Sequence, residues 1–255
     1  MALYHADALV IRSREYGESD RLLTLFARES GKLHAVAKGV RKPTSRQRAG
    51  AQLFTYADFL LHKGRTLDTV TQASPKESFP HLWNDLDRTL AATAIAELLD
   101  VATVREEPQP QLFTLALTCF FLLAEVNPFL VQSIFSLRLL GILGYSPRLG
   151  ECAECGAVIK GDKALFSPTA GGTVCSECRG LFNGKPLSLG TVAFMRQLEH
   201  TEWQKVKRLR WSAWMEQEMR EALQQYCEEK FEKSLRSWRM GKEIGGESSN
   251  NQREG

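Results

Sequence analysis

The first third of the chain carries short runs of apolar and β-branched residues separated by turn residues. Val, Ile, Leu, Phe, Thr and Tyr dominate each run, and Gly17, Gly31 and Gly64 lie in the turns between them. Such runs are typical of β-strands, because branched and aromatic side chains fit a pleated surface. Five short strands in so few residues favour a closed barrel, since closure removes the exposed edges of a lone sheet. We predict these strands over residues 8–13, 21–28, 33–38, 54–62 and 67–72.

Beyond residue 79 the apolar positions recur three and four residues apart, which is the spacing of amphipathic α-helices. Asn127 is a good N-cap for the third of these helices, and Pro128 suits its first turn. The last helix would be a single amphipathic rod about forty ångströms long, from its rise per residue. We predict helices from residue 82 to near residue 106, and over residues 112–126, 127–143, 188–200 and 214–238.

The change of period divides the chain into a β-rich front and a helical remainder, so we predict an α+β protein of several domains. A chain of 255 residues with 43% hydrophobic composition can bury more than one core. The polar, glycine-rich C-terminal tail is expected to be disordered. The predicted divisions are a five-stranded barrel at 1–79, a helical domain in two parts at 80–149 and 183–243, a zinc module at 150–182 and the tail at 244–255.

The most specific chemical signal in the chain is a group of four cysteines. Cys152 and Cys155 form one C-x2-C pair, and Cys175 and Cys178 form a second pair nineteen residues later. Two such pairs are typical of a tetrahedral four-thiolate site for one Zn²⁺ ion. Four protein ligands leave no open coordination position, so the predicted zinc is structural. Two disulfides or reduced core cysteines remain the alternatives.

The net charge of +3 is unevenly distributed along the chain. Residues 1–80 carry thirteen Lys and Arg against eight Asp and Glu, whereas residues 81–150 carry four against seven. Basic surfaces attract phosphate backbones, while an acidic, apolar stretch favours a scaffold or a protein interface. We therefore expect the front of the chain and the helical region to have different partners.

A basic run between the third and fourth predicted strands is the best candidate for binding an anion. It holds Lys38, Arg41, Lys42, Arg46 and Arg48, with no acidic residue among them. Cations this close repel one another unless an anion neutralises them, and small barrels commonly bind nucleic-acid strands. The alternative is a solvated loop that is basic for solubility. Three arginines of the first two strands would extend the same surface: Arg12, Arg14 and Arg21.

A second basic run lies late in the chain and could continue a nucleic-acid path across the helical region. Its cations are Lys205, Lys207, Arg208 and Arg210. Tryptophans bracket the run, and the alternative, which we slightly favour, is that they pack the domain while the cations extend over them into solvent.

Enzymatic function is not predicted. The sequence contains no G-x4-G-K-[ST] phosphate loop, no G-x-G-x-x-G, no H-E-x-x-H and no G-x-S-x-G motif. The N-terminal sequence lacks the pattern of a signal peptide, and the longest apolar stretch, residues 112–124, is too short to span a bilayer. We expect a cytoplasmic protein without membrane partners, in which reduced thiols are available for zinc.

Several stretches, in the same order along the chain, resemble the bacterial RecO family of recombination and repair mediators. They are VIRSREYGESDRLLTLF, GKLHAVAKGVRK, LFTYADF, LDTVTQA, FSLRLLGILGYSP, the zinc pairs CAECG and CSEC, and the closing LRSWRM. The resemblance covers nearly the whole chain up to residue 244. Its ordered succession is far more specific than the cysteine pairs alone.

The resemblance implies an oligonucleotide-binding (OB) barrel followed by a helical domain with an inserted zinc module. It also implies binding of single- and double-stranded DNA, annealing of complementary strands, and binding to the acidic C-terminal tail of the single-stranded-DNA-binding protein (SSB). With RecR, such proteins help to load RecA recombinase, in the bacterial cytoplasm at the nucleoid. Some family members lack the cysteines, which again implies a structural metal.

Two other classes of protein stay open at this point. A zinc-ribbon transcription or translation factor would carry basic or aromatic residues on the cysteine turns, where Lys160, Lys163 and Arg179 stand against four acids. A metal-dependent nuclease would need carboxylates clustered at a cleft.

Overall fold

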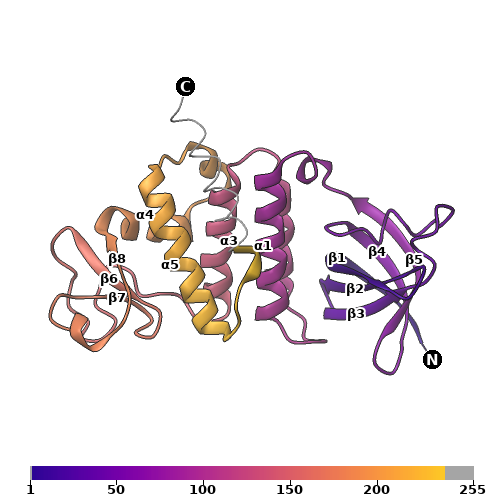
Figure 1. Cartoon of the computed structure of the whole chain (residues 1–255), viewed down its shortest axis with the longest axis horizontal. Helices are drawn as coiled ribbons and strands as arrows, with labels where there is room; N and C mark the ends of the chain where they lie inside the picture. Colours follow the sequence, from indigo (N-terminus) through magenta and orange to yellow (C-terminus); the bar gives the residue numbers. More distant parts are fainter. Residues whose placement is uncertain (1, 239–255) are drawn as a thin grey trace. The chain divides into compact units, whose positions relative to one another are not determined.

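The computed structural model describes residues 2–238, and Figure 1 shows its elements. The chain divides into two compact units, Met1–Ala124 and Glu125–Gly255. The first contains a β-barrel and two α-helices, and the second contains three α-helices and a three-stranded sheet, within the described residues. The five-part domain division predicted above stays a prediction.

The first unit begins with the predicted five-stranded barrel, which the structure confirms as closed (Figure 1). The strand order is β1-β2-β3-β5-β4; β3 pairs in parallel with β5, and the other neighbours are antiparallel. Closure gives each strand a partner on both sides, as small barrels require. The strands are β1 Leu3–Tyr16, β2 Asp20–Ala27, β3 Gly31–Ala37, β4 Tyr56–His62 and β5 Asp68–Glu77.

Strand β1 is much longer than the predicted 8–13, because its two halves pair with different strands. Its first half, from Leu3 to Leu9, pairs with β4, and its second half, from Ala8 to Tyr16, pairs with β2. A bulge between Val10 and Arg12 lies in the β2-paired half. Bulges bend a strand and increase its twist, which lets one strand take part in two pairings of a small barrel.

Small and large apolar residues together fill the inside of the barrel. Strand β2 is buried on both faces over most of its length. Phe26 of β2, for example, packs 6.2 Å from the ring of Phe113. The barrel core includes Ala8, Val10, Leu23, Leu25, Leu33, Ala35, Phe59, Leu61 and Val70.

Two helices complete the first unit. Helix α1, Leu86–Ala102, begins where the Asp85 side chain accepts a hydrogen bond from the Arg88 amide, and a short 3₁₀ helix η1, Pro80–Leu82, precedes it. Helix α2, Pro110–Leu122, begins with a proline, which suits the first turn. Helix α1 ends before the predicted residue 106, and the connection to α2 includes Glu106 with a left-handed φ of 58°.

The second unit is built around helix α3, Pro128–Ile142, which is buried on nearly every side. Asn127 caps it as the sequence predicts, with its Oδ1 accepting a hydrogen bond from the Phe129 amide at 2.9 Å. Helices α4, Leu189–His200, and α5, Ala213–Phe231, pack against α3, and the 3₁₀ helix η3, Trp203–Arg208, lies between them in the chain. Of the helices in residues 2–238, none combines the length and the apolar content needed to cross a membrane.

The prediction of one helix over residues 214–238 is wrong. Helix α5 ends at Phe231, and Glu232 adopts a left-handed backbone with φ of 51°. Leu235 and Trp238 are buried after this turn, and the Leu235 amide donates to Glu228 Oε1 at 2.9 Å. The apolar spacing continues across the turn, and no glycine or proline marks it in the sequence. The tail at 244–255 lies outside the described residues.

Candidate metal centre and nucleic-acid interface

The two cysteine pairs lie on short turns whose sulfur atoms converge. The first turn closes where the Gly156 amide donates to the Cys152 carbonyl at 2.9 Å, and Gly156 adopts the positive φ of 74° that glycine tolerates. The second turn closes through the Arg179 amide and the Cys175 carbonyl at 3.0 Å. All four cysteine sulfurs lie within 4.8 Å of one another. This arrangement could hold one metal ion, and the cysteines form no disulfide.

The pKa values of two of the thiols show why a cation suits this cluster. Burial raises the pKa of Cys152, but amide hydrogen bonds, including one from Cys175 at 3.4 Å, outweigh it and lower the pKa to about 6. The neighbouring sulfurs of Cys175 and Cys155 raise the pKa of Cys178 to about 12. Without a cation, therefore, four adjacent thiolates cannot form together at neutral pH. Zn²⁺ would supply the charge that stabilises them.

A small sheet positions the second pair of cysteines. Strands β6, Lys163–Ser167, β7, Gly172–Val174, and β8, Lys185–Ser188, form this sheet in the order β7-β6-β8. The backbone of Arg148 passes so close to Gly172 that an added Cβ would lie 2.2 Å from the Arg148 carbonyl oxygen. Position 172, at the start of β7, therefore requires glycine, and β7 leads directly into Cys175.

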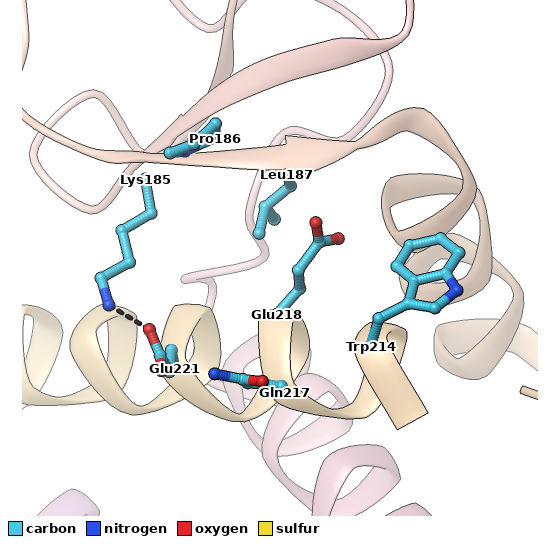
Figure 2. Close-up of a pocket in the computed structure, with 7 residues that line it drawn as sticks. All are labelled: Lys185, Pro186, Leu187, Trp214, Gln217, Glu218 and Glu221. Atoms are coloured by element: carbon cyan, nitrogen blue, oxygen red, sulfur yellow. Dashed lines mark hydrogen bonds and ion pairs between the residues drawn. The ribbon is translucent and has the colours of Figure 1, made fainter. Parts of the chain in front are cut away.

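The sheet is packed onto helix α5 of the same unit. The ring of Phe166 on β6 lies 5.5 Å from the buried Tyr226, whose hydroxyl donates to the Tyr145 carbonyl at 3.0 Å. Figure 2 shows β8 alongside α5, with Lys185 paired to Glu221. The four cysteines thus lie beside a small apolar core, and the sheet next to them packs on α5.

The predicted basic loop lies between β3 and β4 and is anchored to the barrel. The Gly39 amide donates to Asp20 Oδ1 at 2.7 Å, and the Gln47 side chain donates to the Thr71 carbonyl at 2.5 Å. Val40 is buried beneath the loop. The loop is therefore a series of turns fixed at both ends, and its charged side chains lie outside.

Four of the predicted cations on this loop are exposed and uncompensated. Lys38, Lys42, Arg46 and Arg48 have no ion pair with any residue in 2–238. Four like charges within eleven residues of an anchored loop repel one another. An anion with several negative charges would relieve this repulsion.

Arg41 differs from its neighbours on the loop. Its guanidinium pairs with Glu15 Oε1 at 3.0 Å and donates to the Glu18 carbonyl at 3.3 Å. Its amide donates to the Ser19 carbonyl at 2.9 Å, so the loop lies beside the turn between β1 and β2. Arg41 therefore fixes the loop, and less of its charge is available to a ligand.

The three predicted strand arginines have different surroundings. Arg21 of β2 donates to the Ser13 hydroxyl at 3.0 Å, and Arg14 is exposed without an ion pair among the described residues. Arg12 pairs with Asp100 of α1 at 3.4 Å. Arg12 thus connects the barrel to a helix of its own unit.

The second basic run lies on η3 and the two residues after it, and half of its cations have ion pairs. Lys205 pairs with Glu202 at 3.1 Å, and Lys207 pairs with Glu125. Arg210 donates to a neighbouring carbonyl, and Arg208 is exposed without an ion pair in residues 2–238.

The tryptophans around this run make contacts within the unit. The ring of Trp203 lies 4.0 Å from the Arg138 guanidinium, and Trp211 donates to Glu216 at 3.2 Å. The packing interpretation accounts for these contacts, and DNA contact by the run stays a prediction.

Comparison with known families matches both parts of the chain. Residues 1–79 match the model of the recombination protein O N-terminal domain, and residues 84–239 match that of its C-terminal domain. A DNA repair protein RecO of Desulfitobacterium hafniense strain Y51 is 60% identical over 248 residues, covering 96% of this chain and 91% of the relative. Another, from Heliobacterium modesticaldum, is 42% identical over 250 residues with the same coverage. A third, from Moorella thermoacetica, is 36% identical over 248 residues, covering 96% and 93%.

Proposed function

The chain belongs to the RecO family of DNA repair proteins, and we propose that it is a recombination mediator that binds single- and double-stranded DNA through the basic loop of its barrel. The observation that carries the proposal is the set of four exposed, uncompensated cations on an anchored loop. They offer a repeated positive charge to a phosphate backbone. No recognition helix is involved, so binding should depend little on sequence.

The same surface would explain strand annealing. Two complementary strands repel each other through their phosphates, and a protein that neutralises several phosphates on one strand lowers the repulsion felt by the other. Annealing then needs no nucleotide hydrolysis, and we propose that the protein is not an enzyme. Its place would be the bacterial cytoplasm, at the nucleoid.

Partner proteins would supply the remaining steps. We propose that the helical region captures the acidic tail of SSB, which would bring the barrel to coated DNA at high effective concentration. With RecR, the protein would then help to load RecA onto the strand. The family resemblance supports these partners.

The four cysteines Cys152, Cys155, Cys175 and Cys178 would hold one structural Zn²⁺ ion. Their converging sulfurs and the mutual effect on their pKa values support this assignment. A four-thiolate ion has no open position for substrate. The ion would hold the two turns together, and the barrel would bind the DNA.

A zinc-ribbon transcription or translation factor is not favoured. In such a protein the cysteine turns themselves would contact nucleic acid. The family match covers the barrel and the helical region as well as the cysteine turns, which supports the mediator instead.

The proposal can be tested by titrating the full-length protein with a labelled single strand, a duplex of the same sequence and a peptide copy of the SSB tail. We expect salt-sensitive binding to both DNAs and binding of the peptide at a separate site, so that DNA and peptide bind together. Absence of DNA binding at about 50 mM salt would contradict the proposal. Mutual exclusion of peptide and DNA would contradict separate sites.

A further inference from the structure

A half-exposed tryptophan stands on a buried aromatic cluster in the first unit. Trp83 lies between η1 and α1, and 50% of its surface is exposed. Its ring lies 5.6 Å from the ring of Phe54, with an angle of 31° between the planes. Phe54 is fully buried and also contacts Phe120 at 5.5 Å, edge to face. Trp83 therefore contacts a buried ring on one side, while half of the residue's surface is open to solvent.

The support beneath Trp83 is rigid because packing overrides the local backbone preference. Phe54 and Phe79 both adopt left-handed backbones, with φ of 66° and 48°. Large side chains rarely take this conformation, and they keep it only where the surrounding structure fixes them. Here both rings pack against Phe120, at 5.5 and 5.4 Å. The platform under the indole is thus built from residues held in place at a cost in backbone strain.

The platform is continuous with the basic loop. Phe54 follows the loop directly, and its neighbour Thr55 donates through Oγ1 to the carbonyl of Ala49 at 3.3 Å. Ala49 follows Arg48, which is one of the four uncompensated cations. This hydrogen bond holds the residue after Arg48 against the residue after Phe54, the ring that Trp83 contacts.

The acid nearest to Trp83 in the chain already has a basic partner. Asp85 is two residues from Trp83, but its carboxylate accepts from the Arg88 amide at 3.1 Å and pairs with the Arg88 guanidinium at 3.4 Å. Its charge is thus compensated within helix α1.

We propose that Trp83 stacks on a nucleobase of single-stranded DNA whose phosphates are held by the basic loop. The inference rests on the proposed function and adds a contact that distinguishes single strands from duplex. Proteins that bind single strands combine a basic surface with aromatic rings, because every base presents a π-face when it is unpaired. In a duplex the faces of the bases are already stacked on one another, so Trp83 would contribute little there.

Trp214 provides a matched control in the second unit, because 52% of its surface is exposed. It lines a cavity of about 310 Å³ between β8 and α5. Figure 2 shows the indole on the same helix as Glu218 and Glu221. Lys185 is paired with Glu221, and Glu218 leaves the cavity with a net negative charge, which disfavours a phosphate backbone. Changing Trp214 should therefore not affect DNA binding.

The test compares Trp83→Leu, Trp83→Phe and Trp214→Leu in the full-length protein. The probes are an oligothymidylate of about twenty nucleotides and a duplex of the same length, and anisotropy gives the dissociation constants. Leucine still covers Phe54 but has no π-face, whereas phenylalanine keeps one. Trp83→Leu should weaken single-strand binding by a factor of about 5 to 150, since stacking contributes about 1–3 kcal/mol per base. Trp83→Phe should stay within about threefold of the wild type, and Trp214→Leu should leave binding unchanged.

The salt dependence separates stacking from charge. Because stacking releases no counterions, Trp83→Leu should keep the wild-type slope against salt and the wild-type affinity for duplex. Wild-type single-strand affinity in Trp83→Leu would overturn the proposal, and so would an equal loss for single strand and duplex. Either result would leave the proposed function intact if the wild type binds DNA in a salt-dependent way.

A fluorescence readout keeps the test valid if the leucine variant fails to fold. Oligothymidylate should quench tryptophan fluorescence in the wild type and in Trp214→Phe, and this quenching should be lost in Trp83→Phe. Equal quenching in both phenylalanine variants would overturn the proposal.

Discussion

Replacing the four uncompensated cations of the basic loop by alanine should remove most of the salt dependence of DNA binding. The variant is Lys38→Ala, Lys42→Ala, Arg46→Ala and Arg48→Ala combined. These side chains are exposed and have no ion pair in residues 2–238, so their loss should leave the barrel folded. Unchanged circular dichroism and an unchanged unfolding midpoint would verify this.

The magnitude follows from counterion release. Each phosphate neutralised on a single strand contributes about −0.7 to the slope of log affinity against log salt. Four contacts therefore give a slope near −2.8, which corresponds to about fiftyfold weaker binding on going from about 50 to 200 mM salt. The quadruple variant should approach a flat dependence. Arg41→Ala alone should change the slope less than Arg46→Ala, because Glu15 already pairs with Arg41.

The control variant is Lys205→Ala combined with Lys207→Ala. Both side chains are exposed, but each has an acidic partner in its own unit. Anisotropy titrations at four or five salt concentrations would compare the two variants with the wild type. An unchanged slope in the quadruple variant would refute the assignment of the loop. A flattened slope in the control variant would place the DNA on η3 instead.

Three further predictions concern the second unit. Cys155→Ser should bind less than one Zn²⁺ per chain, and residues 150–182 should unfold while the barrel stays folded. The reason is that metal binding by such sites supplies about 10–16 kcal/mol of apparent folding energy. Metal retention on elemental analysis, or loss of DNA affinity with an intact barrel, would contradict this prediction. Acidification should release the ion as the thiols regain their protons. Glu232→Gly should raise the free energy of unfolding by about 0.5–1 kcal/mol, since Glu232 has φ of 51° at the end of α5. Denaturant titration would measure this change. A destabilised variant would show that the Glu232 side chain contributes more to stability than its backbone conformation costs.

Sequence periodicity predicts the elements better than it predicts their ends. The alternation of apolar residues locates all five strands, since one face of each must enter the barrel. It does not reveal that β1 extends from Leu3 to Tyr16, because that length depends on pairing with strands distant in sequence. Periodicity does not predict the turn at Glu232, for a related reason. Tertiary packing of Leu235 and Trp238 continues the apolar pattern where the helix has already ended.

The candidate sites show the same division between local and distant information. The cysteine pairs are predictable because each pair is closed by one turn, and only the meeting of the pairs requires the fold. The composition of the sequence predicts the basic loop. It does not predict which of its cations have ion pairs, since Glu15 contacts Arg41 from strand β1. Trp83 could not be singled out, because its support comes from Phe54, twenty-nine residues earlier in the chain. The only indication in the sequence is that Trp83 is an aromatic residue outside any apolar stripe.

The most direct test of the central claim, that this chain is a recombination mediator, is annealing of complementary oligonucleotides coated with SSB. Pairing would be followed by fluorescence without ATP, using full-length SSB and SSB without its acidic tail. The account predicts that the protein accelerates annealing with full-length SSB and loses most of this effect when the tail is removed. Equal rates with both forms of SSB would contradict recruitment through the tail. No acceleration with either form would contradict the mediator function itself.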